Sequence, residues 1–583
     1  MLLAALGMVL LAFLLGPYVL HGLRFPLGPD APVYLWWTRL AEHDGLSAAQ
    51  RPGVPALALV LQGLGLRPTA VLAALECVLA VSVGTGAAAL VRGLAPRPRA
   101  GWLLAGLLTG TFAVHLAAGY LANLAFSALF LAAAVALAGQ DRRRTAGAAL
   151  LLAAAGFAHP LFFPLGALIL VIQAALAWRA DRAESVRTLG ATIGAGALLG
   201  AGLLALQAGP GPLAVDTSRD GFLRRAGLTD VLRSAYLDRF VHRWARYVEW
   251  ASVPLAVAGL RDARGFAGRF LRAWGLTFLG GVAFSLATGR FPADRFITFG
   301  YVVPILAAIG LVRLWRALER RRALALIATA ALTLAMVAGA WIAWDRQSPF
   351  LSEVEVERAT TAAAYASATA PGTTLVFTVN GPGTTLGFLA TRAANVIRAS
   401  MPPDRIRDVV VLVPPPTSKA TTERVKLAQL TRDDVRAAER AGNGRAVTFV
   451  LAPFDRVDRP PSTIPVSEGV FVSAPTFRPR PIADPLLPTS PWGIALAAVV
   501  VLAALSAVGS GWAGLVAGER AASLALAPAV GAGATILLAI AFERAGLPLE
   551  GHVGPVTVLV VALASGHLVR WILERRARAN PAK

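Results

Sequence analysis

Cysteine is nearly absent from this chain of 583 residues, which contains Cys77 alone. A single cysteine cannot form an intrachain disulfide, so other contacts must hold the fold together. The sequence also lacks a zinc-ligand spacing, a haem-attachment motif and the lysine of a phosphate-binding P-loop. The Asn380–Gly383 turn therefore reads as a tight connection between a strand and a helix rather than as a nucleotide site.

Charged residues are scarce as well, at 15% of the chain, whereas 56% of the residues are hydrophobic. This balance excludes an ordinary soluble protein and predicts a polytopic α-helical membrane protein. Acidic residues number 33 against 55 basic ones, which gives a formal net charge of +22. Because the arginines cluster between apolar segments, we interpret them as orientation signals and lipid contacts, and we expect no nucleic-acid partner.

A bilayer core needs roughly 20 apolar residues per crossing helix. On that basis we predict about fourteen transmembrane helices, of which the first, within residues 1–20, is retained rather than cleaved as a signal peptide. The predicted spans are 2–20, 68–91, 101–117, 120–139, 145–158, 161–178, 188–207, 247–260, 273–288, 296–313, 323–343, 491–515, 521–541 and 553–573.

Arginine-rich loops alternate along these spans, and such loops stay in the cytoplasm. The alternation predicts that both termini are cytoplasmic and that the polar loops 21–54 and 208–246 face outward. The richness in alanine, glycine and arginine is typical of a bacterial genome of high GC content. We therefore expect a multi-pass protein of the bacterial inner membrane.

The composition changes sharply between residues 345 and 490. Three strand-like runs, TTLVFTV, VVVLVP and AVTFVLA, alternate with helical patterns, which indicates parallel βαβ units. A proline-rich segment from Arg459 to Pro491 then leads back to the membrane. We predict three parts: a transmembrane module over 1–344, an extracytoplasmic α/β domain over 345–490, and a three-helix transmembrane module over 491–583.

The most polar stretch beside the membrane runs from Gly28 to Val54. A helix that begins near Asp30 would place Asp30, Tyr34 and Trp37 on one face. A carboxylate at this position could act as a general base or hold a divalent cation on a phosphate. It could equally cap the helix and interact with the positive end of its dipole.

The order of one span, then Gly28-Pro29-Asp30, Tyr34 and Arg51-Pro52-Gly53, then a return to the membrane, resembles the GT-C superfamily of polyprenyl-phosphate-sugar-dependent glycosyltransferases. The resemblance covers the architecture of roughly the first 345 residues. It implies an inverting transfer of sugar from a polyprenyl phosphate to a glycan, lipid or protein acceptor, with Asp30 catalytic. Many members carry two adjacent acids here, whereas Ala31 follows Asp30, so the use of Mg²⁺ or Mn²⁺ stays open.

A departing lipid phosphate needs a cation, and arginine binds phosphate oxygens through two parallel N–H groups. Arginines at helix ends also commonly reach toward lipid headgroups. A histidine at the outer end of a span could contact sugar or phosphate, or could cap its helix. The candidates for binding substrate or lipid phosphate are Tyr34, Arg51, His159, Arg219, Arg290 and Arg295.

Three further residues are secondary candidates. Glu42 and His43 lie on the same expected helix as Asp30 and could shape the acceptor site, or could be solvated. Glu76 lies inside a predicted span, where an ionisable group is costly and suggests function. It could line a groove for the lipid carrier or serve as a hydrogen-bonded packing residue.

Three other functions remain open on the sequence alone. An O-antigen ligase or polymerase would also use lipid-linked sugars, but such enzymes depend on a late outer loop rather than on the first one. A transporter of lipids or sugars would commonly show inverted repeats, which are not detected here. A scaffold that displays the 345–490 domain would be indifferent to replacement of Asp30.

Overall fold

The computed structural model describes most of the chain. The described residues are 2–28, 30–94, 99–117, 119–139, 141–207, 252–288, 299–346, 351–368, 374–378, 393–412, 448–452, 462–473 and 478–579.

Long apolar helices dominate this part of the chain. Seven of them have the length and composition to cross a membrane, which is the property of a helical membrane protein. The seven are α1 (Leu2–Leu20), α4 (Pro68–Leu94), α9 (Arg182–Gln207), α16 (Arg322–Asp345), α20 (Pro491–Trp512), α21 (Arg520–Arg544) and α22 (Val553–Ala579). The expected total of fourteen spans stays a prediction.

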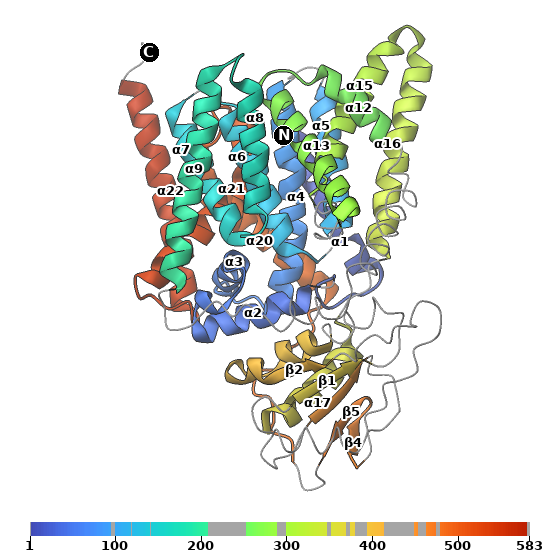
Figure 1. Ribbon diagram of the computed structural model, residues 1–583, viewed down its shortest axis with the longest axis vertical. Coiled ribbons are helices and arrows are strands. Elements are labelled where there is room, and N and C mark those ends of the chain that lie inside the picture. Colours follow the sequence, from blue (N-terminus) through green and yellow to red (C-terminus); the bar gives the residue numbers. More distant parts are fainter. Residues whose placement is uncertain are drawn as a thin grey trace.

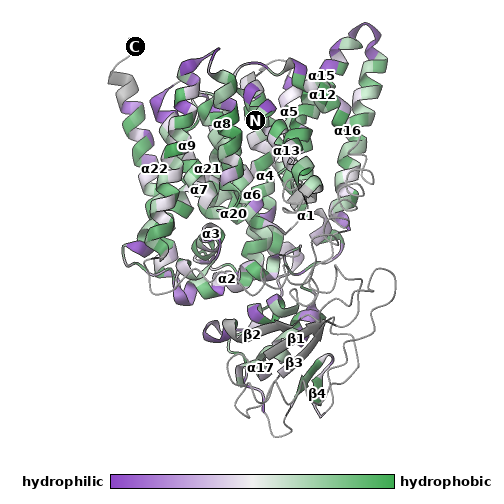
Figure 2. Cartoon of the chain, in the orientation of Figure 1, coloured by the Kyte–Doolittle hydropathy of each residue, from purple (hydrophilic) through white to green (hydrophobic). Residues whose placement is uncertain are grey.

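Further helices lie beside these seven in one bundle, whose members are largely hydrophobic along their lengths and polar at both ends (Figures 1 and 2). They are α5 (Arg99–Ala117), α6 (Leu121–Leu137), α7 (Arg142–Ala158), α8 (Phe163–Ala177), α12 (Ser252–Asp262), α13 (Gly265–Thr288) and α15 (Val302–Ala317). The short turns η3 (Glu319–Arg321) and η5 (Ala513–Leu515) precede α16 and follow α20.

Helix α4 lies at the centre of the bundle, where its apolar window is entirely buried. Glycines let it approach α5 closely: a Cβ atom on Gly84 would lie 2.8 Å from the carbonyl oxygen of Gly106 and 3.0 Å from the Cα of Gly110. Small residues at such a contact allow close packing of backbones, which is how helices associate in lipid.

One end of the bundle differs from the other (Figure 1). Both termini lie at the end away from the sheet, whereas α2 (Ala31–Asp44) crosses the end nearest the sheet. The turn η1 (Leu46–Ala48) and the short apolar helix α3 (Gly53–Gln62) follow it. The expected outer loop 21–54 thus contains a helix, as predicted near Asp30, but α3 was not predicted because ten residues are too few for a span.

Among the described residues between α16 and α20, five strands form one sheet of order β2-β1-β3-β5-β4. They are β1 (Thr374–Thr378), β2 (Val409–Leu412), β3 (Thr448–Ala452), β4 (Ile464–Ser467) and β5 (Val470–Val472). The three predicted strands β1, β2 and β3 pair in parallel, which confirms their expected arrangement. Strand β5 pairs antiparallel with both β3 and β4. Because β4 and β5 lie within 459–491, the prediction of a simple proline-rich connection is wrong there.

Part of the sheet region rests on α2. Helix α17 (Glu353–Ala368) packs on β3, β4 and β5, whereas η4 (Pro403–Asp408) packs on α2. Arg39 of α2 is buried and donates to the carbonyl oxygen of Asp484 at 2.6 Å and to that of Met401 at 3.4 Å. The Arg398 guanidinium lies 5.6 Å from the centre of the Trp36 ring. Helix α2 therefore contacts both the bundle and the sheet region.

Candidate functional site

Asp30 is the N-cap residue of α2, and the helix has a proline in its first turn, where a missing N–H costs nothing. The Tyr34 N–H donates to the Asp30 carbonyl oxygen at 3.1 Å. The half-buried Asp30 side chain, however, makes no capping hydrogen bond, and its backbone is helical (φ −95°, ψ −3°) rather than extended. Asp30 therefore occupies the N-cap position, but its carboxylate does not satisfy the helix N–H groups. The hydrogen-bonded form of the capping alternative is wrong, whereas an interaction with the helix dipole stays open.

Tyr34 lies one turn along α2 and is fully buried. Its hydroxyl oxygen accepts the Arg51 Nη1–H and the Ala122 backbone N–H, both at 3.1 Å. Burial raises the pKa of Tyr34, the Arg51 charge opposes that rise, and the Asp30 charge adds to it. The charges of Asp30 and Arg51 thus both act on this hydroxyl, and the structure brings together three residues that the sequence had singled out.

Arg51 is fixed from two sides. Besides its bond to Tyr34, its guanidinium carbon lies 5.6 Å from the centre of the Trp37 ring. Trp37 in turn meets Tyr34 edge to face, with ring centres 5.6 Å apart and an interplanar angle of 84°. A guanidinium has five N–H donors, so a half-buried arginine that spends one on Tyr34 has others with which to bind an anion.

His159 lies next to the segment that carries Arg51. The helix α7 ends at Ala158, and a Cβ atom on Gly53 would lie 2.7 Å from the Ala158 nitrogen. His159 follows directly, is buried, and stacks on Phe162 with ring centres 4.0 Å apart. The backbone N–H of His159 also donates to the Ala155 carbonyl oxygen at 2.9 Å, so this residue ends α7. This arrangement agrees with both open roles, a helix end and a neighbour of the site.

Glu76 has a structural explanation in the described contacts. It is buried about two turns from the start of α4, toward the α2 end of the bundle. Its carboxylate accepts the Tyr18 hydroxyl at 3.2 Å and the Gly119 N–H at 2.8 Å, and Gly119 has a φ of 72° that favours glycine. Glu76 thus ties α1, α4 and the turn before α6 together, which favours the packing role over the carrier groove.

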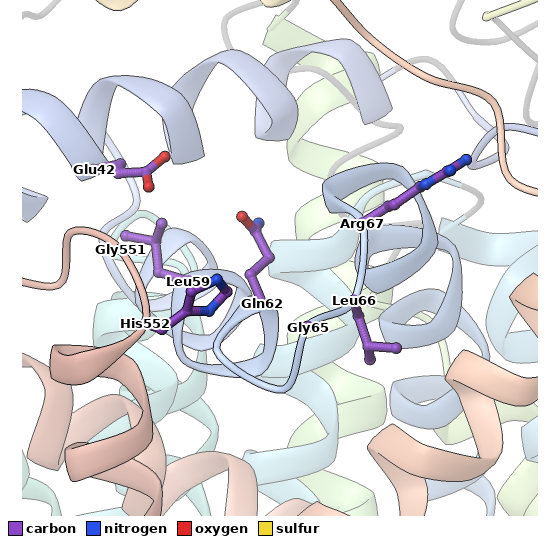
Figure 3. A pocket seen from close by; sticks show the side chains of 8 residues that line it. All are labelled: Glu42, Leu59, Gln62, Gly65, Leu66, Arg67, Gly551 and His552. Atoms are coloured by element: carbon purple, nitrogen blue, oxygen red, sulfur yellow. The ribbon is translucent and has the colours of Figure 1, made fainter. Parts of the chain in front are cut away.

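Glu42 and His43 lie at the other end of α2, about 18 Å from Asp30 along the helix axis. His43 is exposed, and its Nδ1 lies 2.7 Å from the Asp44 Oδ1. Glu42 lines a separate cleft with residues that the sequence did not single out (Figure 3). Gln62, Arg67 and His552 were missed because nothing in a linear sequence indicates that the turn before α22 returns to α2 and α3.

Three predicted phosphate-binding residues, Arg219, Arg290 and Arg295, lie outside the described residues, as does the loop 208–246. Within the described ranges, no group of three or more histidine, cysteine or acidic side chains is placed to hold a metal ion. The site as described therefore consists of Asp30, Tyr34, Trp37, Arg51 and the adjacent His159.

Comparison with known proteins adds no relative to this picture. No protein-family model matches the sequence, and no curated protein matches it significantly.

Proposed function

We propose that this protein is a membrane glycosyltransferase of the GT-C type, which transfers a sugar from a polyprenyl phosphate to a glycan, lipid or protein acceptor. The reaction takes place at the end of the bundle that carries α2 and the sheet. In this proposal that end faces outward from a bacterial inner membrane, and the termini are cytoplasmic.

The observation that carries the proposal is that a carboxylate without a capping hydrogen bond and an anchored guanidinium both act on one buried hydroxyl. Asp30 makes no capping bond, and Arg51 is held by Tyr34 and Trp37. The charges of an acid and of a cation both act on the Tyr34 hydroxyl, which supports a single reaction centre. A carboxylate that was needed only to start α2 would instead bind the helix N–H groups.

The chemistry follows from these two groups. Asp30 accepts the proton of the acceptor hydroxyl, whose oxygen attacks the anomeric carbon of the sugar. The bond from that carbon to the phosphate oxygen breaks, and the electron pair stays on the lipid phosphate. Arg51 neutralises the charge that develops there through N–H groups directed at the phosphate oxygens. Tyr34 positions Arg51.

The test uses purified protein in nanodiscs and radiolabelled polyprenyl-phosphate sugars, with Mg²⁺, with Mn²⁺ and with a chelator. We expect release of sugar by the unchanged protein and a loss of at least about 100-fold in Asp30→Asn, because general base catalysis contributes that much. Asp44→Asn is the matched control, since Asp44 lies at the opposite end of the same helix and bonds to His43.

If no donor is consumed, or if Asp30→Asn and Asp44→Asn react alike, the transferase assignment is wrong. In that case the transporter and scaffold interpretations take precedence. Arg51→Gln tests the role of the cation, because losing the group that neutralises the charge developing on the lipid phosphate should lower kcat.

A further inference from the structure

A second site lies at the C-terminal half of α2 and plays no part in the chemistry proposed above. It is a cleft of about 350 Å³, a size typical of small-ligand sites. Its walls come from α2, the end of α3, the turn that follows it, and the turn before α22 (Figure 3). The lining residues are Glu42, Leu59, Gln62, Gly65, Leu66, Arg67, Gly551 and His552.

Polar groups approach the cleft from different elements. Glu42 comes from α2, Gln62 from α3, and His552 stands beside Leu59 (Figure 3). The Gln62 Nε2 is buried and has no hydrogen-bond partner within the described part of the chain. A buried amide without a partner is costly, and a bound ligand with a hydroxyl or carbonyl oxygen would supply that partner.

The charges around the cleft disfavour an anionic ligand. Arg67 directs its guanidinium away and donates to the Pro488 carbonyl oxygen at 2.8 Å (Figure 3). Burial, together with the nearby charges of Asp484 and Glu550, raises the pKa of Glu42, while the Gly551 N–H and Arg39 oppose that rise. A phosphate beside Gln62 would therefore meet acidic groups, while the Arg67 guanidinium points away from it.

A sugar ring fits these walls better. Its hydroxyl groups can donate to the Glu42 carboxylate and accept from the Gln62 amide, and His552 can do either. Its apolar C–H face can lie on Leu59 and Leu66, which complete the lining. An alkyl chain, by contrast, would leave the buried Gln62 amide without a partner.

We propose that this cleft binds a neutral sugar unit of the acceptor glycan. The acceptor role rests on the proposed function, whereas the binding of carbohydrate does not. Because Glu42 lies about 18 Å along α2 from Asp30, the bound unit is several sugars away from the reacting hydroxyl. The site would thus favour longer acceptors over monosaccharides.

The experiment measures binding directly, by calorimetry on nanodisc-embedded protein that has been freed of maltoside detergent, whose sugar headgroup would compete. The probes are a panel of methyl hexopyranosides and pentofuranosides with their di- and tetrasaccharides, and inorganic phosphate and methylammonium serve as charged alternatives. We expect at least one oligosaccharide to bind, and Gln62→Leu to raise its Kd about tenfold or more. Glu42→Gln keeps the shape of the side chain and should give a smaller rise.

His43→Gln is the matched control, because His43 neighbours Glu42 but does not line the cleft. The assignment is overturned if no sugar binds, if only phosphate or methylammonium binds, or if the Kd is the same in Gln62→Leu and His43→Gln. Each variant is first checked for an unchanged elution profile and helical signal, and Glu42→Gln decides the matter if Gln62→Leu does not fold.

The two proposals fail separately. Sugar binding that Gln62→Leu weakens, without any release of sugar from lipid donors, would keep the cleft and refute the transferase. Suppose instead that transfer depends on Asp30, but that Gln62→Leu and the unchanged protein depend on acceptor length in the same way. That result would keep the transferase and refute the role of the cleft.

Discussion

Tyr34 is the residue on which the candidate site depends most directly. Its buried hydroxyl oxygen accepts hydrogen bonds from the Arg51 and Ala122 N–H groups, and removal of that oxygen would remove both bonds. We expect Tyr34→Phe to lower the free energy of unfolding by about 1–3 kcal/mol, the usual cost of a buried unsatisfied polar group. Thermal unfolding in nanodiscs measures this change.

Trp37→Phe provides the comparison for Tyr34→Phe. It weakens the contact with Arg51 but leaves both hydrogen bonds to the Tyr34 hydroxyl in place. If the two variants melt at the same temperature, the hydroxyl is not what holds Arg51.

Glu42 should make stability depend on pH. Burial raises its pKa in the folded state above the ordinary value of 4.5, so the folded protein binds more protons than the unfolded chain between these two values. The contribution of this residue is therefore greatest below about pH 4.5 and falls as the pH rises through the folded-state pKa. Glu42→Gln should remove this dependence. Between pH 4 and neutral pH, the free energy of unfolding of the variant should therefore fall less than that of the unchanged protein.

Melting curves of both proteins between pH 4 and 8 test this. Parallel curves across the whole range would show that Glu42 is as well solvated in the folded protein as in the unfolded chain.

At the scale of single helices, two aspartates at N-cap positions behave differently. The Asp141 side chain accepts the Arg144 N–H at 2.8 Å at the start of α7, whereas Asp30 makes no such bond at the start of α2. We expect Asp141→Ala to cost about 1 kcal/mol of stability, and Asp30→Ala to cost less. Chemical denaturation of the two variants compares them, and an equal or larger loss in Asp30→Ala would return Asp30 to a capping role.

Helix α2 should also hold the sheet region in place through Arg39. Its guanidinium donates to the carbonyl oxygens of Asp484 and Met401, so Arg39→Ala should speed amide hydrogen exchange in 393–412 and 478–490. The free energy of opening of these segments should fall by about the 1–3 kcal/mol that such bonds contribute. Arg39→Lys should have an intermediate effect. Arg92→Ala is the control, because Arg92 pairs with Glu519 at the opposite end of the bundle, and exchange that rises equally in both alanine variants would refute the coupling.

For the whole molecule, the two ends of the bundle should face opposite sides of a membrane. Cys77 is fully buried, so an introduced cysteine is labelled without background. The exposed Ala483 precedes α20 at the sheet end, and the exposed Arg320 lies in the turn before α16 at the end that carries the termini (Figure 1). In intact cells a membrane-impermeant maleimide should label Ala483→Cys and not Arg320→Cys, and the converse pattern would invert the proposed orientation.

The sequence by itself determined the helical membrane character, the parallel pairing of β1, β2 and β3, and the helix that begins near Asp30. These features follow from local information, namely the length of apolar runs, the alternation of strand and helix patterns, and a proline in a first turn. It also singled out Tyr34 and Arg51, because polar residues are rare beside apolar spans.

Tertiary structure alone decided the rest. Tyr34 bonds to Ala122, Glu76 is satisfied by Tyr18 and Gly119, and His552 lines the same cleft as Glu42. In each case, segments far apart in the chain come together. Such contacts depend on how helices pack, and packing depends on close approaches such as that of Gly84 to Gly106, which carry no local signal. The availability of the Asp30 carboxylate is of the same kind, since a sequence places an acid at a helix start but only the folded backbone decides whether its side chain caps the helix.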